Sequence, residues 1–344
     1  MLNFDEFQEY AKMKIPELIA EKGEQVEVIL NHVTKNNGVI LHAATVKTED
    51  SCIAPNIYLD GAFKQYEEGA DLDELMDKLA ETAFSNLKAP EELATVGKDY
   101  QNFDFVKDKI IMTVVNAEKN RELLADVPHE NREDLAMIYK VMLSKSSQGL
   151  ATITIRNEHM KAWGVTEAEI HELAMKNTRE ILPVTVQSMG EVLGEFAGEA
   201  GIPEDMNRSL FADMPLDEQM FIISNASKVN GAASIFYEDA LSDLADKIGT
   251  DLYILPSSVH ECIAVSTHMG TPEMLSEMVR EVNGSEVAES EQLSDHVYRF
   301  DAETRKLSLA DTTMEEILAK VSEDTRTYEA ASEAGESSRP HHHR

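Results

Sequence analysis

The pattern of apolar and polar positions predicts short helices and strands along most of the chain. An amphipathic helix is expected over 4–20. Two β-rich segments flank Asn36-Asn37-Gly38, and an Asn-Gly pair in such a place favours a hairpin. Residues 53–59 add a possible strand, and a helix follows in which Asp71 and Glu74 suit the N-cap and N3 positions.

The same pattern continues from residue 109 to residue 310. The predicted strands are 109–115, 134–143, 150–156, 220–224, 232–237, 251–255 and 261–266. Helices are expected over 117–127, after the Thr166 and Glu169 capping pair, over 238–248 before Gly249, and after Thr271 and Pro272. The last of these helices is expected to bury Leu275, Met278, Val279 and Val282. A closing hairpin should turn at 301–304.

The order of these elements predicts an α+β fold with largely antiparallel sheets. Segments 109–181 and 232–285 both show the order strand, helix, strand, strand, helix, which suggests two similar modules from an internal duplication. We expect an N-terminal module over 1–182, a helical connection over 183–218 that glycine and proline interrupt, and a C-terminal module over 219–321. Residues 322–344 lack apolar periodicity and should form a disordered tail.

The charge balance narrows the function classes. The chain has 64 acidic and 31 basic residues, for a formal net charge of −33, so binding to nucleic-acid phosphates is disfavoured. Such acidity suits either plain solubility or a basic protein partner. No apolar run approaches the ~20 residues that span a bilayer, and the first residues are acidic where a signal peptide is basic, so a cytoplasmic protein without membrane contact is expected.

The common cofactor and metal motifs are absent from the sequence. Cys52 and Cys262 are too far apart for a metal knuckle or a redox pair. There is no HExxH motif, no calcium-binding loop and no glycine-rich phosphate loop of the two usual kinds. We therefore expect neither a metal nor a cofactor.

The densest group of reactive side chains lies between two predicted strands. Ser257, Ser258, His260 and Glu261 supply hydroxyls, an imidazole and a carboxylate that could act as nucleophile, base and orienting group of a hydrolase. The spacing is not specific for that chemistry, and the strained GxSxG turn is absent. A turn whose Ser and His groups bond to local backbone amides is the structural alternative.

Asparagines follow two of the predicted strands and form a second candidate set. A polar binding cleft between the modules would use five residues: Asn116, Asn120, His129, Asn225 and Asn230. Asparagines at strand ends more often cap helices or turn the chain, which is the structural alternative.

Three segments carry a resemblance to a known family: VNAEKNRELLADVPHENREDLAMIYKV at 115–141, ISNASKVNGAASIFYEDALSDLADKIGTDLYILPSSVHECIAV at 223–265 and LSDHVYRFD at 293–301. They resemble a bacterial family catalogued only as a domain of unknown function. The resemblance implies no activity, cofactor or catalytic residue. The sequence therefore favours a non-enzymatic acidic binding or regulatory protein with a basic partner, and the Ser/His/Glu hydrolase is the alternative. The oligomeric state is left open.

Overall fold

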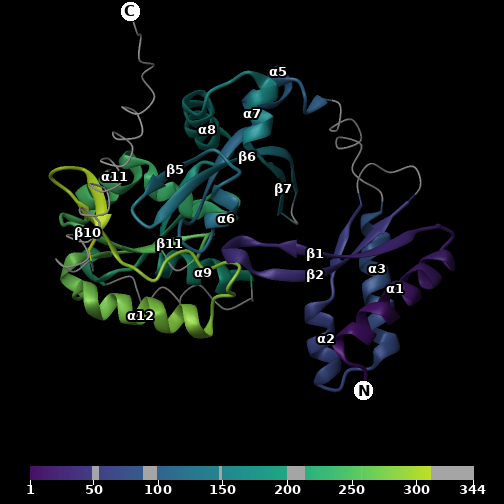
Figure 1. Cartoon of the computed structure of the whole chain (residues 1–344). Coiled ribbons are helices and arrows are strands. Elements are labelled where there is room, and N and C mark those ends of the chain that lie inside the picture. Colours follow the sequence, from purple (N-terminus) through teal and green to yellow (C-terminus); the bar gives the residue numbers. More distant parts are fainter. Residues whose placement is uncertain (49–53, 88–98, 147–148, 200–213, 257, 311–344) are drawn as a thin grey trace, which may run out of the picture.

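The computed structural model describes residues 1–48, 54–87, 99–146, 149–199, 214–256 and 258–310 (Figure 1). Within them every paired strand runs antiparallel to its neighbours, and helices cover the sheets, so the expected α+β class is confirmed. None of the described helices is long and apolar enough to cross a membrane. Residues 311–344, with the expected tail, lie outside the described residues.

The N-terminal unit is a three-stranded sheet, of order β1-β2-β3, with helices packed on it. Its elements are α1 (Phe4–Ala20), β1 (Glu27–Thr34), η1 (Asn36–Gly38), β2 (Ile40–Lys47), β3 (Asn56–Tyr58), α2 (Asp60–Glu67) and α3 (Leu72–Asn86). The predicted hairpin is confirmed, with Asn37 at its tip in the left-handed region at φ 60°. Asp71 caps α3 by accepting the backbone N–H groups of Asp73 and Glu74, as the sequence predicted.

A four-stranded sheet follows, with the long strand β6 at its centre. Strand β4 pairs with one edge of β6, and β5 and β7 pair with the other. The elements are α5 (Phe103–Val106), η3 (Lys107–Lys109), β4 (Ile110–Asn116), α6 (Arg121–Leu124), β5 (His129–Arg132), β6 (Leu135–Ser146), β7 (Gly149–Thr154), α7 (Asn157–Trp163) and α8 (Glu167–Ile181). The capping box of Thr166 and Glu169 opens α8 as predicted.

The last sheet has six strands in the order β13-β12-β10-β11-β9-β8. Its elements are β8 (Val184–Ser188), α9 (Met189–Glu199), η4 (Leu216–Glu218), β9 (Phe221–Asn225), η5 (Gly231–Phe236), α11 (Glu238–Ile248), β10 (Leu252–Leu255), β11 (Cys262–Ser266), η6 (Thr267–Met269), α12 (Pro272–Ser285), β12 (Tyr298–Asp301) and β13 (Lys306–Leu309). The first residues of the expected connection 183–218 thus form the edge strand of this sheet. Residues 200–213 lie outside the described residues.

One predicted strand, 232–237, is wrong: all of its residues except Tyr237 belong to the 3₁₀ helix η5. Every residue from Gly231 to Ile235 is buried, whereas a half-buried strand alternates. The small side chains here let a tight helical turn pack between β4 and β9, and the hydroxyl of Ser234 donates to the carbonyl oxygen of Ser224. Packing against two strands outweighed the β propensity of Ile235 and Phe236.

The two larger sheets share a local strand order. In one sheet β5, β6 and β4 lie side by side in that order, and in the other β10, β11 and β9 do. In each set of three, the strand that comes last in the sequence lies in the middle. Both sets are antiparallel. The expected internal duplication itself stays a prediction.

Helix α12 packs on the outer face of the six-stranded sheet, and its buried face differs from the predicted one. Leu275 and Val279 are buried against Val265 and Val297. Met278 and Val282, which the sequence assigned to the core, are 44% and 36% exposed. Polar Ser276 and Asn283 are buried in their place, and the Asn283 amide donates to the carbonyl oxygen of Ser294 at 3.0 Å.

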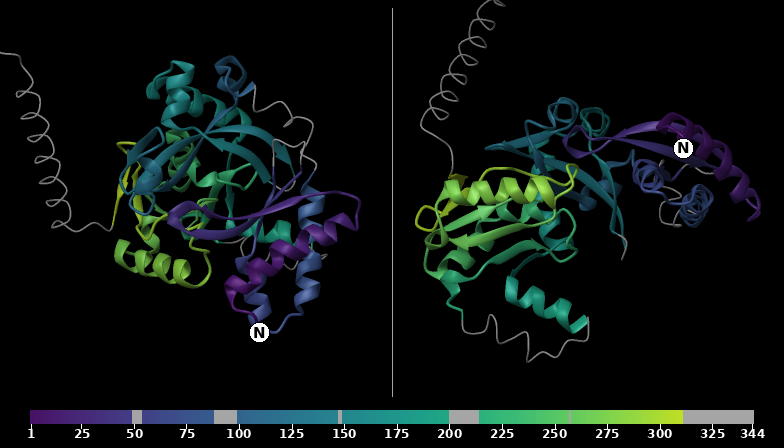
Figure 2. Two further views of the ribbon diagram at one scale, coloured as in Figure 1. Left: turned by 45° about the vertical axis from the view of Figure 1, so that its right-hand side comes forward. Right: turned by 90° about the horizontal axis from the view of Figure 1, so that it is seen from below.

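The tip of the N-terminal hairpin reaches across to the rest of the molecule. Figures 1 and 2 show β1 and β2 extending from their helices to the body. The Asn37 amide donates to the carbonyl oxygens of Glu289 and Gln292 at 2.7 and 2.8 Å. Asn36 donates to the carbonyl oxygen of Ser290 at 3.1 Å. We call residues 286–297 the docking loop.

Candidate functional site

The structure places the predicted turn 256–261 between β10 and β11, against the docking loop. Ser258 is 7% exposed and bridges to Gln292, and the Val259 N–H donates to the carbonyl oxygen of Glu291 at 2.8 Å. Glu261 is half-buried. Ser257 lies outside the described residues. The turn is thus held by backbone contacts to residues some 30 positions later in the chain.

The two ring nitrogens of His260 face groups other than Ser258. The backbone N–H of Asn230 donates to Nδ1 at 3.2 Å, so Nδ1 acts as an acceptor. Nε2 lies 3.7 Å from the Glu291 carboxylate. Ser258 Oγ instead accepts the backbone N–H of His260 at 2.9 Å. These contacts are those of a structural turn, in which Ser and His groups bond to local backbone amides. The hydrolase hypothesis stays a prediction.

Close packing joins this turn to the end of β9. The Ser224 hydroxyl donates to the carbonyl oxygen of His260 at 2.8 Å. Asn230 takes a left-handed conformation, with φ 53°, and Gly231 then passes so near that a Cβ atom would lie 2.6 Å from that carbonyl oxygen. The side chain of Asn225 turns the chain by accepting the N–H of Ser227 at 2.9 Å. Asn230 therefore contacts the 256–261 turn through its backbone N–H, and Asn225 turns the chain that leads to it.

Asn116 and Asn120 hold the docking loop and the hairpin tip. The Asn116 amide donates to the carbonyl oxygen of Leu293 at 3.1 Å, and its Oδ1 accepts the N–H of Lys119. The Asn120 amide donates to Asn37 Oδ1 at 3.0 Å, and its own Oδ1 accepts the Asn37 N–H at the same distance. Both amides are almost fully buried. Their polar atoms are occupied by links between distant parts of the chain.

His129 lies apart from the four asparagines, on β5. Its backbone N–H donates to the Glu167 carboxylate at 2.9 Å, and its Nδ1 lies 3.0 Å from the carbonyl oxygen of Val127. The structure brings Asn116 and Asn120 together, and Asn225 and Asn230 together. It does not gather all five residues at one open cleft in the described residues, and their proposed binding role stays a prediction.

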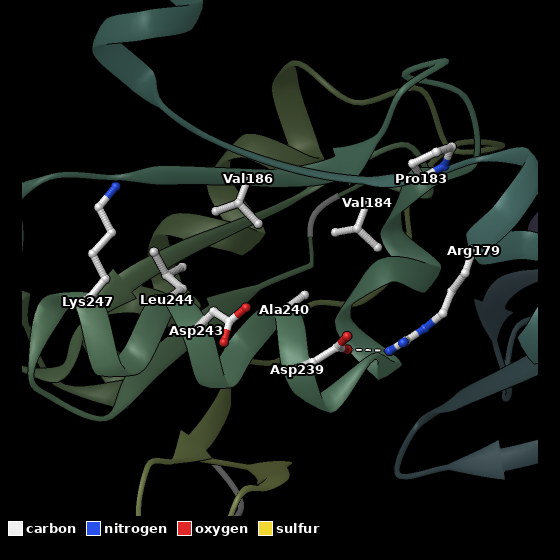
Figure 3. Close-up of a pocket in the computed structure, with 9 residues that line it drawn as sticks. All are labelled: Arg179, Pro183, Val184, Val186, Asp239, Ala240, Asp243, Leu244 and Lys247. Carbon is white, nitrogen blue, oxygen red and sulfur yellow. Dashed lines mark hydrogen bonds and ion pairs between the residues drawn. The ribbon is translucent and has the colours of Figure 1, made fainter.

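A groove lies elsewhere, between the edge strand β8 and helix α11 (Figure 3). Its volume is about 460 Å³. The side chains of Val184 and Val186 project from β8 toward α11, where Ala240 and Leu244 complete an apolar floor. Val186 is 37% exposed. This volume falls in the range of pockets that bind small molecules.

Charged side chains stand along the rim of this groove. Arg179 forms an ion pair with Asp239 at one end and also lies over the Tyr237 ring, 4.4 Å from its centre. Burial raises the pKa of Tyr237 to about 12. Lys247 stands at the other end. The Asp243 carboxylate projects into the groove between these two ends, and it has no ion-pair partner among the described residues.

The outer face of α12 is a second unusual surface. Met274, Met278 and Val282 are 50%, 44% and 36% exposed, and they recur every four residues. A glutamate precedes each of them, and all three glutamates are exposed: Glu273, Glu277 and Glu281. Residues four apart lie on the same side of a helix, so the face carries an apolar stripe beside an acidic stripe. Figure 1 shows α12 on the outside of the body.

Sequence reasoning missed both surfaces. On α12 the apolar residues form two stripes about 100° apart, and either could have faced the sheet. The spacing of three glutamates beside Met274, Met278 and Val282 is the signal that could have marked one stripe as exposed. For the groove, the isolated alternation of Val184 and Val186 after Pro183 was the available sign of a strand.

The described residues contain no group of three or more His, Cys, Asp or Glu side chains that could hold a metal ion. Residues 4–302 match the model of a family of unknown function, DUF5688. The protein belongs to that family. No curated protein and no solved structure matches the chain.

Proposed function

We propose that this protein is a non-enzymatic binding or regulatory protein that engages a basic protein partner through the outer face of α12. The observation that carries the proposal is the apolar stripe of Met274, Met278 and Val282 beside the acidic stripe of Glu273, Glu277 and Glu281. The net charge of −33 adds long-range attraction for a basic partner.

The side chains of the apolar stripe are not part of the buried cluster that α12 forms with the sheet. The side of α12 that faces the sheet already buries Leu275 and Val279, at 5% and 2% exposure. Three large apolar side chains in one row on the solvent side are typical of a helix that docks on another protein. Methionine suits such a surface because its flexible thioether adapts to a partner's shape.

The acidic stripe places carboxylates at helical spacing on the exposed side of α12. Glutamates four residues apart on a helix repel each other, by about 0.2–0.5 kcal/mol per pair. Arg280, the only basic residue of α12, donates to Ser276 Oγ at 3.1 Å. The surface therefore fits an apolar groove with lysines or arginines along one side.

The test compares capture from cell lysate by the wild-type protein and by a double variant, Met274→Ser with Met278→Ser. We expect the wild type to enrich basic proteins, and the double variant to lose about tenfold in affinity for them. Capture should also weaken as salt rises from about 0.1 M to about 1 M, because the screening length falls from about 10 Å to about 3 Å.

Met13→Ser is the matched control, because Met13 is 63% exposed on α1 and should not matter for capture. Enriched proteins that are not basic, capture that is insensitive to salt, or equal capture by the α12 double variant would contradict the proposal.

A further inference from the structure

We infer that β8 and the groove below it receive an extended segment of another polypeptide, which adds to the six-stranded sheet as a new edge strand. This surface is separate from the outer face of α12, and the inference does not depend on the function proposed for that face. The segment carries an apolar side chain for the groove and, two residues away, a lysine or arginine for Asp243.

The hydrogen-bond register of β8 leaves alternate backbone groups pointing outward. The carbonyl oxygen of Pro183 accepts the N–H of Ala226 at 2.9 Å, and the N–H of Met189 donates to the carbonyl oxygen of Met220 at 2.8 Å. In an antiparallel pair every second residue bonds to the neighbouring strand. Thr185 and Gln187 therefore bond to β9, and the N–H and C=O groups of Val184 and Val186 face the open edge.

Strand β8 is the last strand of its sheet within the described part of the chain. Val184 and Val186 therefore combine two features at one place: free backbone groups at the edge and side chains that form the floor of the groove. Addition of a strand uses both, because backbone hydrogen bonds supply affinity and pockets for alternate side chains supply specificity.

The Asp243 carboxylate favours a segment with a basic side chain. A side chain two residues from the apolar one lies on the same face of an added strand, where the Asp243 carboxylate projects. A second copy of this chain fits less well, because Val184–Ser188 contains no basic residue and each copy has a net charge of −33. A basic segment of a different protein meets both conditions.

The test uses fluorescence anisotropy with a labelled synthetic peptide, acetyl-VTKTVT-amide, whose valines and lysine share one face of a strand. We expect wild-type protein to bind it with a dissociation constant below about 1 mM. The same peptide with its backbone N-methylated at alternate residues should bind at least about tenfold more weakly, because those amides can no longer pair with β8.

Two variants test the two parts of the surface. Val186→Pro removes one outward N–H and keeps the bonds of Thr185 and Gln187 to β9, so it should fold normally and weaken binding by about tenfold. Asp243→Asn should weaken it by about fivefold, through loss of the charged pair. The matched controls are Ile40→Thr on β2 and Asp77→Asn on α3, both at exposed positions, which should bind as the wild type does.

Four results would overturn the inference. Two concern the peptides: the wild type does not bind at millimolar peptide concentration, or the N-methylated peptide binds as tightly as the unmodified one. Two concern the protein: Asp77→Asn and Asp243→Asn weaken binding equally, or the wild type sediments as a dimer and Val186→Pro as a monomer. The last result would assign the edge to a second copy. The N-methylated peptide keeps the test decisive if Val186→Pro fails to fold.

Discussion

Gly231 offers a sharp test of how the 256–261 turn is held. An added Cβ atom would lie 2.2 Å from Ser224 Oγ, 2.6 Å from the carbonyl oxygen of His260 and 2.7 Å from the backbone nitrogen of Asn225. The serine hydroxyl can rotate away, but it then loses its bond to His260, at a cost of about 1 kcal/mol. The other two atoms are backbone, and moving them costs about 1–3 kcal/mol.

Gly231→Ala should therefore lower the free energy of unfolding by about 2–4 kcal/mol. Urea denaturation followed by circular dichroism measures this as a lower midpoint with an unchanged slope. Gly194→Ala is the matched control: it lies in α9 with nothing within 4 Å of the added atom, and it should stabilise the helix by up to about 1 kcal/mol.

A second variant separates the parts of the cost. Adding Ser224→Ala to Gly231→Ala relieves the hydroxyl contact but not the two backbone contacts, so most of the loss should remain. Ordinary surface substitutions change the free energy of unfolding by no more than about 0.5 kcal/mol. If Gly231→Ala alone changes it by so little, the packing described for β9 and the turn is wrong.

Two further predictions concern the hairpin and acid stability. Asn37→Ala removes the amide bonds to Glu289 and Gln292, removes the acceptor of the Asn120 amide and places alanine at φ 60°. It should therefore lower the free energy of opening the hairpin tip by about 2–4 kcal/mol, and faster amide hydrogen exchange in β1 and β2, with α12 unchanged, would show this. The Ala302 N–H and Arg299 hold the pKa of Asp251 below its usual 3.8, so its stabilisation is complete above that pH and is lost as pH falls through the lower folded-state value. Asp251→Asn should thus cost about 1 kcal/mol at pH 7 and progressively less as the pH falls below 3.8, and a loss that does not change with pH would contradict this.

Local signals in the sequence predicted much of this fold. Capping at Asp71 and Thr166 and the left-handed Gly249 after α11 depend on a few neighbouring residues, and each is confirmed. The prediction failed where distant packing decides. Residues 232–237 have strand-like composition, and only their position between β4 and β9 makes them helical.

The candidate site shows the same limit. Asparagine at the end of a strand is typical of a structural residue, but the sequence could not predict which groups these asparagines bond to. Asn116 bonds to Leu293, 177 residues later, and Asn120 bonds to Asn37, 83 residues earlier. The outer face of α12 and the groove beside β8 depend on which side of an element the fold covers, and periodicity alone does not decide that.

The docked hairpin tip has a consequence for how the chain is made. Asn36 and Asn37 leave the ribosome roughly 250 residues before Ser290 and Glu289, which accept their amide hydrogens. The N-terminal unit has its own buried core and can form early, but its tip cannot dock until the last sheet is nearly complete. A nascent chain stopped before the docking loop would expose these two asparagines. The hairpin can therefore dock only after synthesis has passed that loop.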